Sequence, residues 1–384
     1  MRLSASCIRC FKACPMRFYY QYVLGLVPAV EPDHFRVGTN YHFIQQIHSM
    51  KPGNPCMCVE SGRGAHEVAN CVLCESTGVF PNDPMDAVVR HLNKQYAEPP
   101  MGKTVDEWET ERTILLYSLV GYKWWYEDAG YEVEHLERRF KMPLLSPTTG
   151  HPLRADVVGI IDRIFAAGGN RFVHEYKSSS DNLDPDSDLW GKLTLDTQTR
   201  LYTYAAKRLD LGMCGVLYDV WRKPKTRPKK LTQGESKKFA VDGMYMGESF
   251  NVQHGSDYSV ISVNAKTAEV TPGAKEGTFA IRETPEMYGA RLLQDITTNP
   301  GKHFARKEIA HHQASIDAFQ WELYHIYKTI SEMVNNGRWW CDESQCDATF
   351  KCQYTPFCYT HKVVEAEEVP DGFRKIPTSI GGNK

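Results

Sequence analysis

The chain has 384 residues, which is enough for two or three average domains or for one enzyme domain with insertions. Hydrophobic residues make up 42% and charged residues 24%, ordinary values for a soluble globular protein with ample material for a core. The formal net charge of −2 at pH 7 argues against a protein that coats nucleic acid indiscriminately, although a local basic patch is compatible with phosphate binding.

No stretch of the sequence approaches the roughly 18 consecutive apolar residues of a transmembrane helix. The N-terminal residues Met-Arg-Leu-Ser-Ala-Ser-Cys lack the apolar segment and cleavage site of a secretion signal. We therefore expect no membrane association and a reducing cytoplasm, the host cytoplasm if the chain is phage-encoded. Because thiols stay reduced there, the 12 cysteines indicate metal ligands rather than disulfides.

A helical pattern covers residues 4–25, which open with the capping residue Ser4 and are interrupted by Pro15. Cys10 and Cys7 precede Cys14 by roughly one and two helical turns. They are either small buried apolar residues or spare metal ligands.

Residues 37–42, Val-Gly-Thr-Asn-Tyr-His, lead into an apolar helix, so His42 is expected at a helix start. A single histidine there is typical of a packed, hydrogen-bonded core residue, and a metal ligand is the alternative.

Four cysteines fall in a polar stretch at 51–80, as Cys56-Met-Cys58 followed by Cys71-Val-Leu-Cys74. Cys-x-Cys followed by Cys-x-x-Cys has the spacing of a tetrahedral thiolate site, which predicts structural zinc. His66 in the same loop is an alternative ligand.

Residues 83–130 have helical periodicity, and the Trp-Trp-Tyr run at 124–126 suits a buried face. Residues 131–143 alternate like a strand.

Residues 159–177 predict a β-hairpin, because two short apolar, β-branched runs flank a Gly-Gly-Asn turn at 168–170. Alternation along the second strand puts Glu175 and Lys177 on one face, and Asp162 can face them from the first strand.

Two carboxylates and an ammonium at a sheet edge suit Mg²⁺- or Mn²⁺-assisted hydrolysis of a phosphodiester. Asp162 and Glu175 would supply the hard oxygen ligands, and a metal-bound water would be the nucleophile. Lys177 would orient that water or neutralise charge on the phosphate. An ordinary solvated hairpin is the alternative for an isolated Glu-x-Lys.

Gln198 and Tyr202 are four residues apart in a helical pattern, so they share a face. The next segment, 215–221, is predicted to be a buried strand. It ends in an extended basic loop in which Pro224 and Pro228 forbid regular pairing. The loop either is a solvated surface or follows a phosphate backbone through its cations, Arg222, Lys223, Lys225, Arg227, Lys229 and Lys230.

Residues 239–275 read as an irregular, β-rich insertion to which no chemistry is assigned. Residues 283–330 predict long amphipathic helices, with Arg306 either contacting phosphate or pairing with Glu308. The tail holds four more cysteines, at 341, 346, 352 and 358.

The order Asp162, Glu175-Tyr-Lys177 and Gln198-Thr-Arg-Leu-Tyr202 resembles the core of the PD-(D/E)XK nuclease superfamily. The resemblance is to its RecB-like, CRISPR-adaptation-type branch of iron-sulfur exonucleases from phages and bacteria. One mild departure is Glu175, where aspartate is commoner in the family.

The resemblance implies several roles. Gly38-x-x-x-His42 matches the motif whose histidine joins the acidic residues at the metal, and the family also uses a backbone carbonyl at the position of Tyr176. Gln198 and Tyr202 would lie near the scissile strand. The family's [4Fe-4S] ligands map onto Cys14, Cys346, Cys352 and Cys358. Zinc fits this ligand count equally well, and Cys341 is a spare ligand or replaces Cys346.

We therefore expect an α/β, restriction-endonuclease-like core sheet flanked by helices, an iron-sulfur cluster joining the chain ends, and a small zinc-binding insertion. The expected regions are the N-terminal cluster and metal-ligand helices (1–50), the cysteine-rich insertion (51–80), a helical region (81–130), the nuclease core (131–238), the β-rich insertion (239–275) and the C-terminal helices and tail (276–384).

The expected function is a metal-dependent DNA exonuclease, most simply one specific for single strands, in recombination, repair or phage DNA processing. The alternatives are a redox sensor and a catalytically silent iron-sulfur subunit that binds nucleic acid in a larger helicase-nuclease or recombination complex. The chain has no Gly-x-x-x-x-Gly-Lys-Ser/Thr phosphate loop, so a motor would have to come from a partner.

Overall fold

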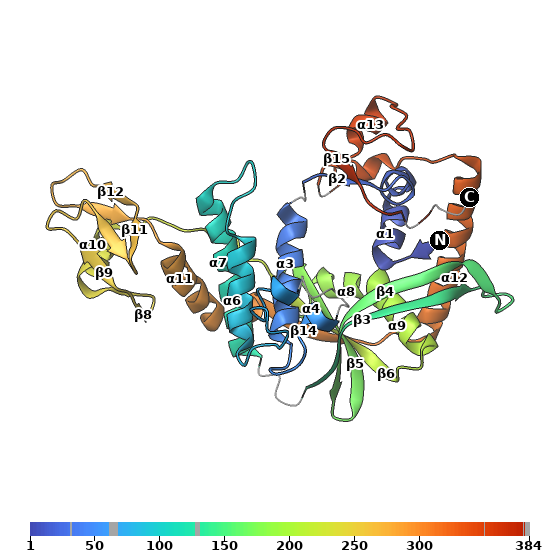
Figure 1. Ribbon diagram of the computed structural model, residues 1–384, viewed down its shortest axis with the longest axis horizontal. Coiled ribbons are helices and arrows are strands. Elements are labelled where there is room, and N and C mark those ends of the chain that lie inside the picture. The colour runs from blue at the N-terminus through green and yellow to red at the C-terminus, as the bar shows by residue number, and fades with distance from the viewer. Residues whose placement is uncertain (31–32, 61–67, 127–130, 349, 379, 381–384) are drawn as a thin grey trace.

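A mixed six-stranded sheet lies at the centre of the molecule, with helices on both faces (Figure 1). The computed structural model describes residues 1–30, 33–60, 68–126, 131–348, 350–378 and 380. The strand order is β1-β4-β5-β6-β14, with β3 also paired to β4. The predicted α/β class with a helix-flanked core sheet is confirmed. The strands are Arg2–Leu3 (β1), Glu132–Leu145 (β3), Pro152–Ala167 (β4), Asn170–Ser179 (β5), Met213–Arg222 (β6) and Phe304–Ile309 (β14).

β4 and β5 form the antiparallel hairpin that the sequence predicts. Their ladder runs from Arg163 opposite His174 to Ala167 opposite Asn170. Gly168 and Gly169 make the turn with φ of 56° and 81°, a left-handed conformation that glycine adopts without a Cβ clash.

β4 has an opening along one of its edges. On that side β1 pairs with Asp156 and Val157, and β5 pairs only from Arg163 onward. Within the described chain, residues 158–162 therefore have no strand beside them on this edge. Asp162 lies where β4 and β5 separate, and this separation positions the candidate site.

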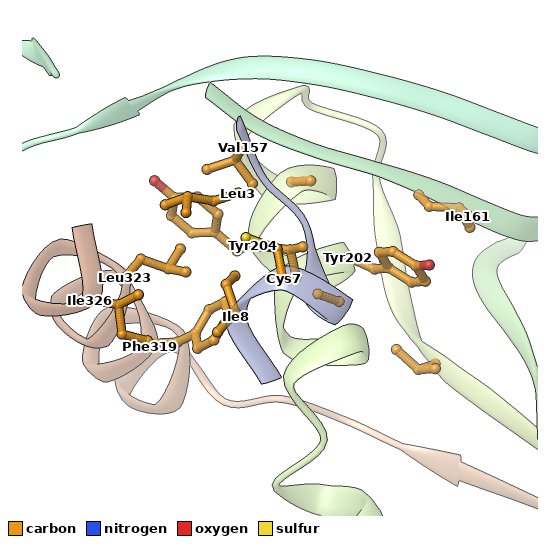
Figure 2. Packing of buried hydrophobic residues seen from close by; sticks show 14 of the residues in the cluster. Leu3, Cys7, Ile8, Val157, Ile161, Tyr202, Tyr204, Phe319, Leu323 and Ile326 are labelled. Atoms are coloured by element: carbon orange, nitrogen blue, oxygen red, sulfur yellow. The ribbon is translucent and has the colours of Figure 1, made fainter. Parts of the chain in front are cut away.

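Three helices cover one face of the sheet: α1 (Ala5–Ala13), α9 (Thr197–Arg208) and α12 (Gln313–Asn336). Ile8, Tyr204 and Phe319 bring the three helices into one buried cluster with Val157 of β4 (Figure 2). The side chain of Ser4 caps α1, as expected, by accepting from the N–H of Cys7. This packing joins α1, near the start of the chain, to α12, more than three hundred residues later.

The opposite face is covered by α3 (Asp33–His48), α6 (Pro84–Gln95), α7 (Val105–Trp125) and α11 (Pro285–Thr298). Tyr41 of α3 stacks on Trp221 of β6 with ring centroids 4.0 Å apart. A capping box between Thr104 and Glu107 starts α7. The predicted helical region is thus a layer packed on the sheet.

Two sequence-based expectations about helices are wrong. His42 lies inside α3 rather than at a helix start, because the helix begins at Asp33 and Val37, Tyr41 and Ile44 already bury one face of it. The Trp-Trp-Tyr run is not a buried face, since Trp124 and Trp125 are 53% and 44% exposed at the end of α7.

The sequence analysis also missed two strands of the central sheet. β1 precedes the helical segment predicted at 4–25, where no strand was expected, and β14 lies within the region predicted to form long amphipathic helices. Arg306 of β14 has a partner that the sequence did not suggest: its Nε donates to Oδ2 of the buried Asp219 at 2.8 Å. Charge composition hid this strand, because Phe304 and Ile309 are its buried apolar ends and the residues between them are largely charged.

A separate hydrophobic cluster lies at the far left of Figure 1, where α10 (Gln233–Asp242) packs on small strands. Its buried residues include Leu231, Phe239, Ile261 and Met287. The strands are Met244–Tyr245 (β7), Glu248–Ser249 (β8), Val252–His254 (β9), Ile261–Val263 (β10), Lys266–Ala268 (β11), Val270–Pro272 (β12) and Phe279–Ile281 (β13).

Shorter elements complete the described chain. They are α2 (Pro15–Phe18), η1 (Tyr19–Val23), β2 (Leu26–Pro28), α4 (Met57–Glu60), α8 (Asp188–Thr194), η2 (Pro300–Lys302), η3 (Glu343–Gln345), α13 (Thr355–Tyr359) and β15 (Phe373–Lys375). Among the helices described, none has the length and apolar character needed to cross a membrane.

Candidate active site and metal centres

Asp162, Glu175 and Lys177 come together where β4 and β5 separate. The backbone N–H of Tyr176 donates to Oδ2 of Asp162 at 3.2 Å, which links the two strands just beyond the end of their ladder. Nζ of Lys177 lies 3.0 Å from Oε1 of Glu175. The Tyr176 peptide is thus part of the site, and its carbonyl oxygen remains a predicted metal ligand.

His42 approaches the same carboxylate from α3. Its Nδ1 lies 3.3 Å from Oδ2 of Asp162. Burial opposes protonation of the ring, but the contact with Asp162 and the charges of Asp162 and Glu175 outweigh burial and raise the pKa of His42. The structure therefore brings together the three side chains that were predicted to bind the metal, His42, Asp162 and Glu175, with Lys177 beside them.

Glu175 is the most buried group of the site, at 1% exposure. Lys177 is near Oε1, while Oε2 has no hydrogen-bond donor among the described residues. Burial, followed by repulsion from Asp162, raises the pKa of Glu175 to about 7. A buried carboxylate oxygen without a donor is costly, and a divalent cation is a ligand that would satisfy it. The site fits the metal that the sequence predicts.

Lys177 is held by three groups at once. Besides Glu175, its Nζ lies 3.2 Å from Oδ2 of Asp196 and donates to Oε1 of Gln198 at 2.9 Å. Burial opposes its charge, but Glu175 and Asp196 outweigh burial and raise the pKa of Lys177. Sequence reasoning missed Asp196, although an aspartate that starts a helix is a recognisable N-cap signal. Oδ1 of Asp196 accepts from the N–H of Gln198 at 2.8 Å.

Gln198 and Tyr202 support Lys177 instead of facing the carboxylates. Nε2 of Gln198 donates to the hydroxyl of Tyr202 at 3.0 Å, and that hydroxyl donates to the carbonyl of Ile160 on β4. A continuous chain of hydrogen bonds thus runs from the ammonium of Lys177 through α9 to the exposed edge of β4. Gln198 and Tyr202 therefore position the ammonium of Lys177.

Glu137 of β3 is a further acidic residue that sequence reasoning missed. The register pairs Leu136 with Arg163 and Arg138 with Ile161, so Glu137 lies opposite Asp162. Its φ is 50°, a left-handed conformation that is unfavourable for a residue with a Cβ. Burial and the charge of Asp162 raise the pKa of Glu137 to about 7. No sequence signal could have found it, because strand register alone puts it there.

The four cysteines of the 51–80 region form a compact group. Their sulfurs all lie within 4.8 Å of one another, and the Cys56–Cys71 and Cys58–Cys74 pairs are 3.8 and 3.7 Å apart. Tetrahedral thiolates at the usual zinc–sulfur distance would be about 3.8 Å apart. His66, the alternative ligand, lies outside the described residues.

The terminal cysteines meet although more than three hundred residues separate the first from the rest. Cys14, Cys341, Cys346, Cys352 and Cys358 line one small cavity of about 20 Å³. The N–H of Asp342 donates to Sγ of Cys14 at 3.4 Å. The structure thus brings together the predicted ligand set, and Cys341 with it.

The basic loop leaves the sheet beside the site. β5 and β6 run parallel, with Lys177 level with Val220 and Ser179 level with Arg222. The N–H of Lys223 then donates to the carbonyl of Ser179 at 3.2 Å. Four of the six predicted phosphate contacts are exposed, namely Lys225, Arg227, Lys229 and Lys230, and Arg222 and Lys223 are half-buried.

Comparison with known proteins agrees with this geometry. The family model of the PD-(D/E)XK nuclease superfamily matches residues 2–359, which include β4, β5, α9 and all the cysteines. No curated protein matches the chain significantly. Because the family match extends over nearly the whole chain, the protein belongs to the PD-(D/E)XK nuclease superfamily.

Proposed function

We propose that the protein is a metal-dependent DNA exonuclease that acts on single strands in recombination, repair or phage DNA processing. The observation that carries the proposal is the buried Glu175 carboxylate, which has an oxygen without a donor and faces Asp162, His42 and Lys177. The acidic pair supplies the oxygen ligands of a hard cation. Single-strand preference and processing from an end rest on the resemblance to iron-sulfur exonucleases.

His42, Asp162, Glu175 and the carbonyl of Tyr176 would hold Mg²⁺ or Mn²⁺. When bound, the metal would supply Lewis-acid activation of a water and of the phosphodiester. Lys177, fixed by Asp196 and Gln198, would place its ammonium where negative charge grows on the phosphate. Glu137, opposite Asp162, adds a carboxylate at which a proton can be held.

Two further metals belong to the proposal. The short sulfur–sulfur distances of Cys56, Cys58, Cys71 and Cys74 favour a single zinc ion. The terminal cysteines line one cavity and supply the four thiolates of a [4Fe-4S] cluster, which the family resemblance assigns to Cys14, Cys352, Cys358 and either Cys346 or Cys341. Both metals would be structural.

The deciding experiment is digestion of end-labelled single and double strands with Mg²⁺ or Mn²⁺. We expect the wild type to shorten single strands from one end. Asp162→Ala and Lys177→Ala should each lower the rate at least about a hundredfold, because loss of a ligand or of the charge-stabilising ammonium costs roughly 3 kcal/mol of barrier. DNA binding should persist, since most phosphate contacts lie elsewhere.

Asp156→Ala is the matched control. Asp156 lies on the same strand, about 20 Å away at ~3.3 Å per residue, and pairs with Lys141 at 3.2 Å. This variant should cleave like the wild type. Cleavage by purified Lys177→Ala at the wild-type rate would refute the assignment of the site.

A further inference from the structure

A pocket of about 500 Å³ lies directly beside the candidate active site. It lies along the opening of β4, between residues 158–160 and the first turns of α1. Gln198 and Tyr202, which support Lys177, also line this pocket, so it shares a wall with the catalytic centre. The proposed cleavage step assigns no part of the substrate to this pocket.

The pocket is cationic. Arg9 and Arg139 are its charged residues, and no carboxylate lines it. Within the described ranges, neither guanidinium forms an ion pair or a hydrogen bond, and both side chains are exposed. By contrast, the pocket between α7 and the basic loop mixes carboxylates such as Asp106 with cations such as Lys223. Two unpaired guanidiniums without a carboxylate favour an anionic ligand, and phosphate suits their fork geometry.

Apart from Ser4, Ser6, Gln198 and the hydroxyl of Tyr202, the rest of the lining is apolar. Phe140 and Tyr202 meet edge to face with centroids 6.1 Å apart, and Ile160 continues the surface at 36% exposure. Gly159 permits this contact, because a Cβ there would lie 2.5 Å from Cζ of Phe140. Figure 2 shows Tyr202 beside α1 with its hydroxyl directed toward the strand of Ile161. Phe140 and Tyr202 are only 7% and 4% exposed, so Ile160 is the apolar group of this wall that a sugar or a base can contact.

We infer that this pocket binds the nucleotide next to the scissile phosphate, with Arg9 and Arg139 on its phosphate group and the apolar wall at Ile160 against its sugar or base. This subsite presupposes the proposed nuclease function and adds the path of the strand, which would leave the catalytic centre along α1. The pocket adjoins the centre, because Gln198, which lines it, accepts from Nζ of Lys177 at 2.9 Å.

The first test measures binding without catalysis. Full-length wild type, Arg9→Ala and Arg139→Ala are titrated in EDTA with a fluorescein-labelled oligothymidylate of about a dozen nucleotides over a range of salt. Each substitution should weaken binding about tenfold, as for one charge-assisted hydrogen bond, and lower the salt slope by about 0.7. Arg138→Ala is the control, because Arg138 is an exposed neighbour that does not line the pocket.

The second test locates the contact along the strand. One phosphate at a time is replaced by an uncharged methylphosphonate, and single-turnover cleavage with Mg²⁺ is compared between the wild type and Arg9→Ala. At the phosphate adjoining the cleaved bond, the methylphosphonate alone and Arg9→Ala alone should each slow cleavage about tenfold. The two changes together should slow cleavage no more than either one does, because both remove the same contact.

Two outcomes would overturn the subsite: wild-type salt slopes for both arginine variants, or losses that multiply at every phosphate position. If the wild type still degrades DNA in either case, the subsite fails and the nuclease assignment stands. If the wild type neither binds nor cleaves any strand, the proposed function itself fails, and the subsite fails with it.

Discussion

At the scale of single residues, the site depends on one carboxylate that water cannot reach. Glu175 is buried among groups of both signs, and its pKa of about 7 reflects burial first and repulsion from Asp162 second. Below about pH 7 a carboxylate in this position holds a proton, which a bound cation must replace. Metal binding and proton release are therefore coupled.

This coupling predicts the pH dependence of metal affinity. Below pH 7 the metal must displace a proton from Glu175, and above pH 7 it need not. The dissociation constant for Mn²⁺, measured by electron paramagnetic resonance of the free ion, should be about tenfold higher at pH 6 than at pH 8. Glu175→Gln should bind Mn²⁺ more weakly and lose this component of the pH dependence. Equal wild-type affinities at pH 6 and pH 8 would contradict the coupling.

At the scale of elements, β14 is the edge strand next to β6 and contributes a charge that stabilises the sheet. Asp219 of β6 is 2% exposed and meets three partners: Tyr122 of α7, His174 of β5 and Arg306 of β14. His174 stays neutral, since burial and the charge of Arg163 lower its pKa to about 4. Arg306 is thus a main countercharge of Asp219 on the face opposite Glu175.

Removal of Arg306 should destabilise the protein strongly. Arg306→Ala leaves a buried carboxylate without this countercharge, and the free energy of unfolding should fall by about 3 kcal/mol or more. Urea denaturation without added Mg²⁺ or Mn²⁺, with the cysteine-bound metals in place, measures this change. The control is Arg171→Ala on β5, whose half-exposed ion pair with Glu134 at 2.9 Å should contribute about 1 kcal/mol or less. Similar losses of unfolding free energy in the two variants would contradict the role of Arg306 as the countercharge of Asp219.

The basic loop is the second element with a measurable role. If its exposed cations follow the DNA backbone, replacing Lys225, Arg227 and Lys229 with alanine should weaken single-strand binding and flatten its salt dependence by roughly 0.7 per lost contact. Lys328→Ala, an exposed lysine on α12, serves as the control. An unchanged salt slope in the triple variant would return the loop to an ordinary solvated surface.

At the scale of the whole molecule, the two cysteine sites should differ in what they hold together. The terminal site joins Cys14 to a tail that begins at Cys341, and α1 packs with α12 close by (Figure 1). Closing so long a loop restricts the unfolded chain far more than closing the short 56–74 segment. Loss of the terminal metal should therefore destabilise the whole fold, and loss of the other should act locally.

Protein purified without oxygen should accordingly be brown and contain about four irons and one zinc per chain. Cys14→Ala should lose the colour and lower the melting temperature of the whole protein. Cys71→Ala should lose zinc but keep the brown colour and the wild-type melting temperature. Elemental analysis, visible absorption and thermal denaturation check these outcomes. Colourless protein with two zincs, made with ample iron, would reject the cluster and leave the nuclease site unaffected.

The sequence by itself determined the local parts of this protein. Asp162, Glu175 and Lys177 could be predicted because a glycine turn between two β-branched runs fixes a hairpin, and alternation then fixes which side chains share a face. Cysteine spacing and the four-residue interval between Gln198 and Tyr202 were equally local signals.

Only the tertiary structure decided what depends on strand register and on contacts between distant segments. Glu137 reaches the site through its position opposite Asp162, and Arg9 reaches it through the packing of α1 against β4. β14 was hidden because its sequence is mostly charged, and Arg306 is stabilised there by Asp219, 87 residues away. A local sequence pattern cannot predict these contacts between distant residues, because the residues meet only when the whole sheet has assembled.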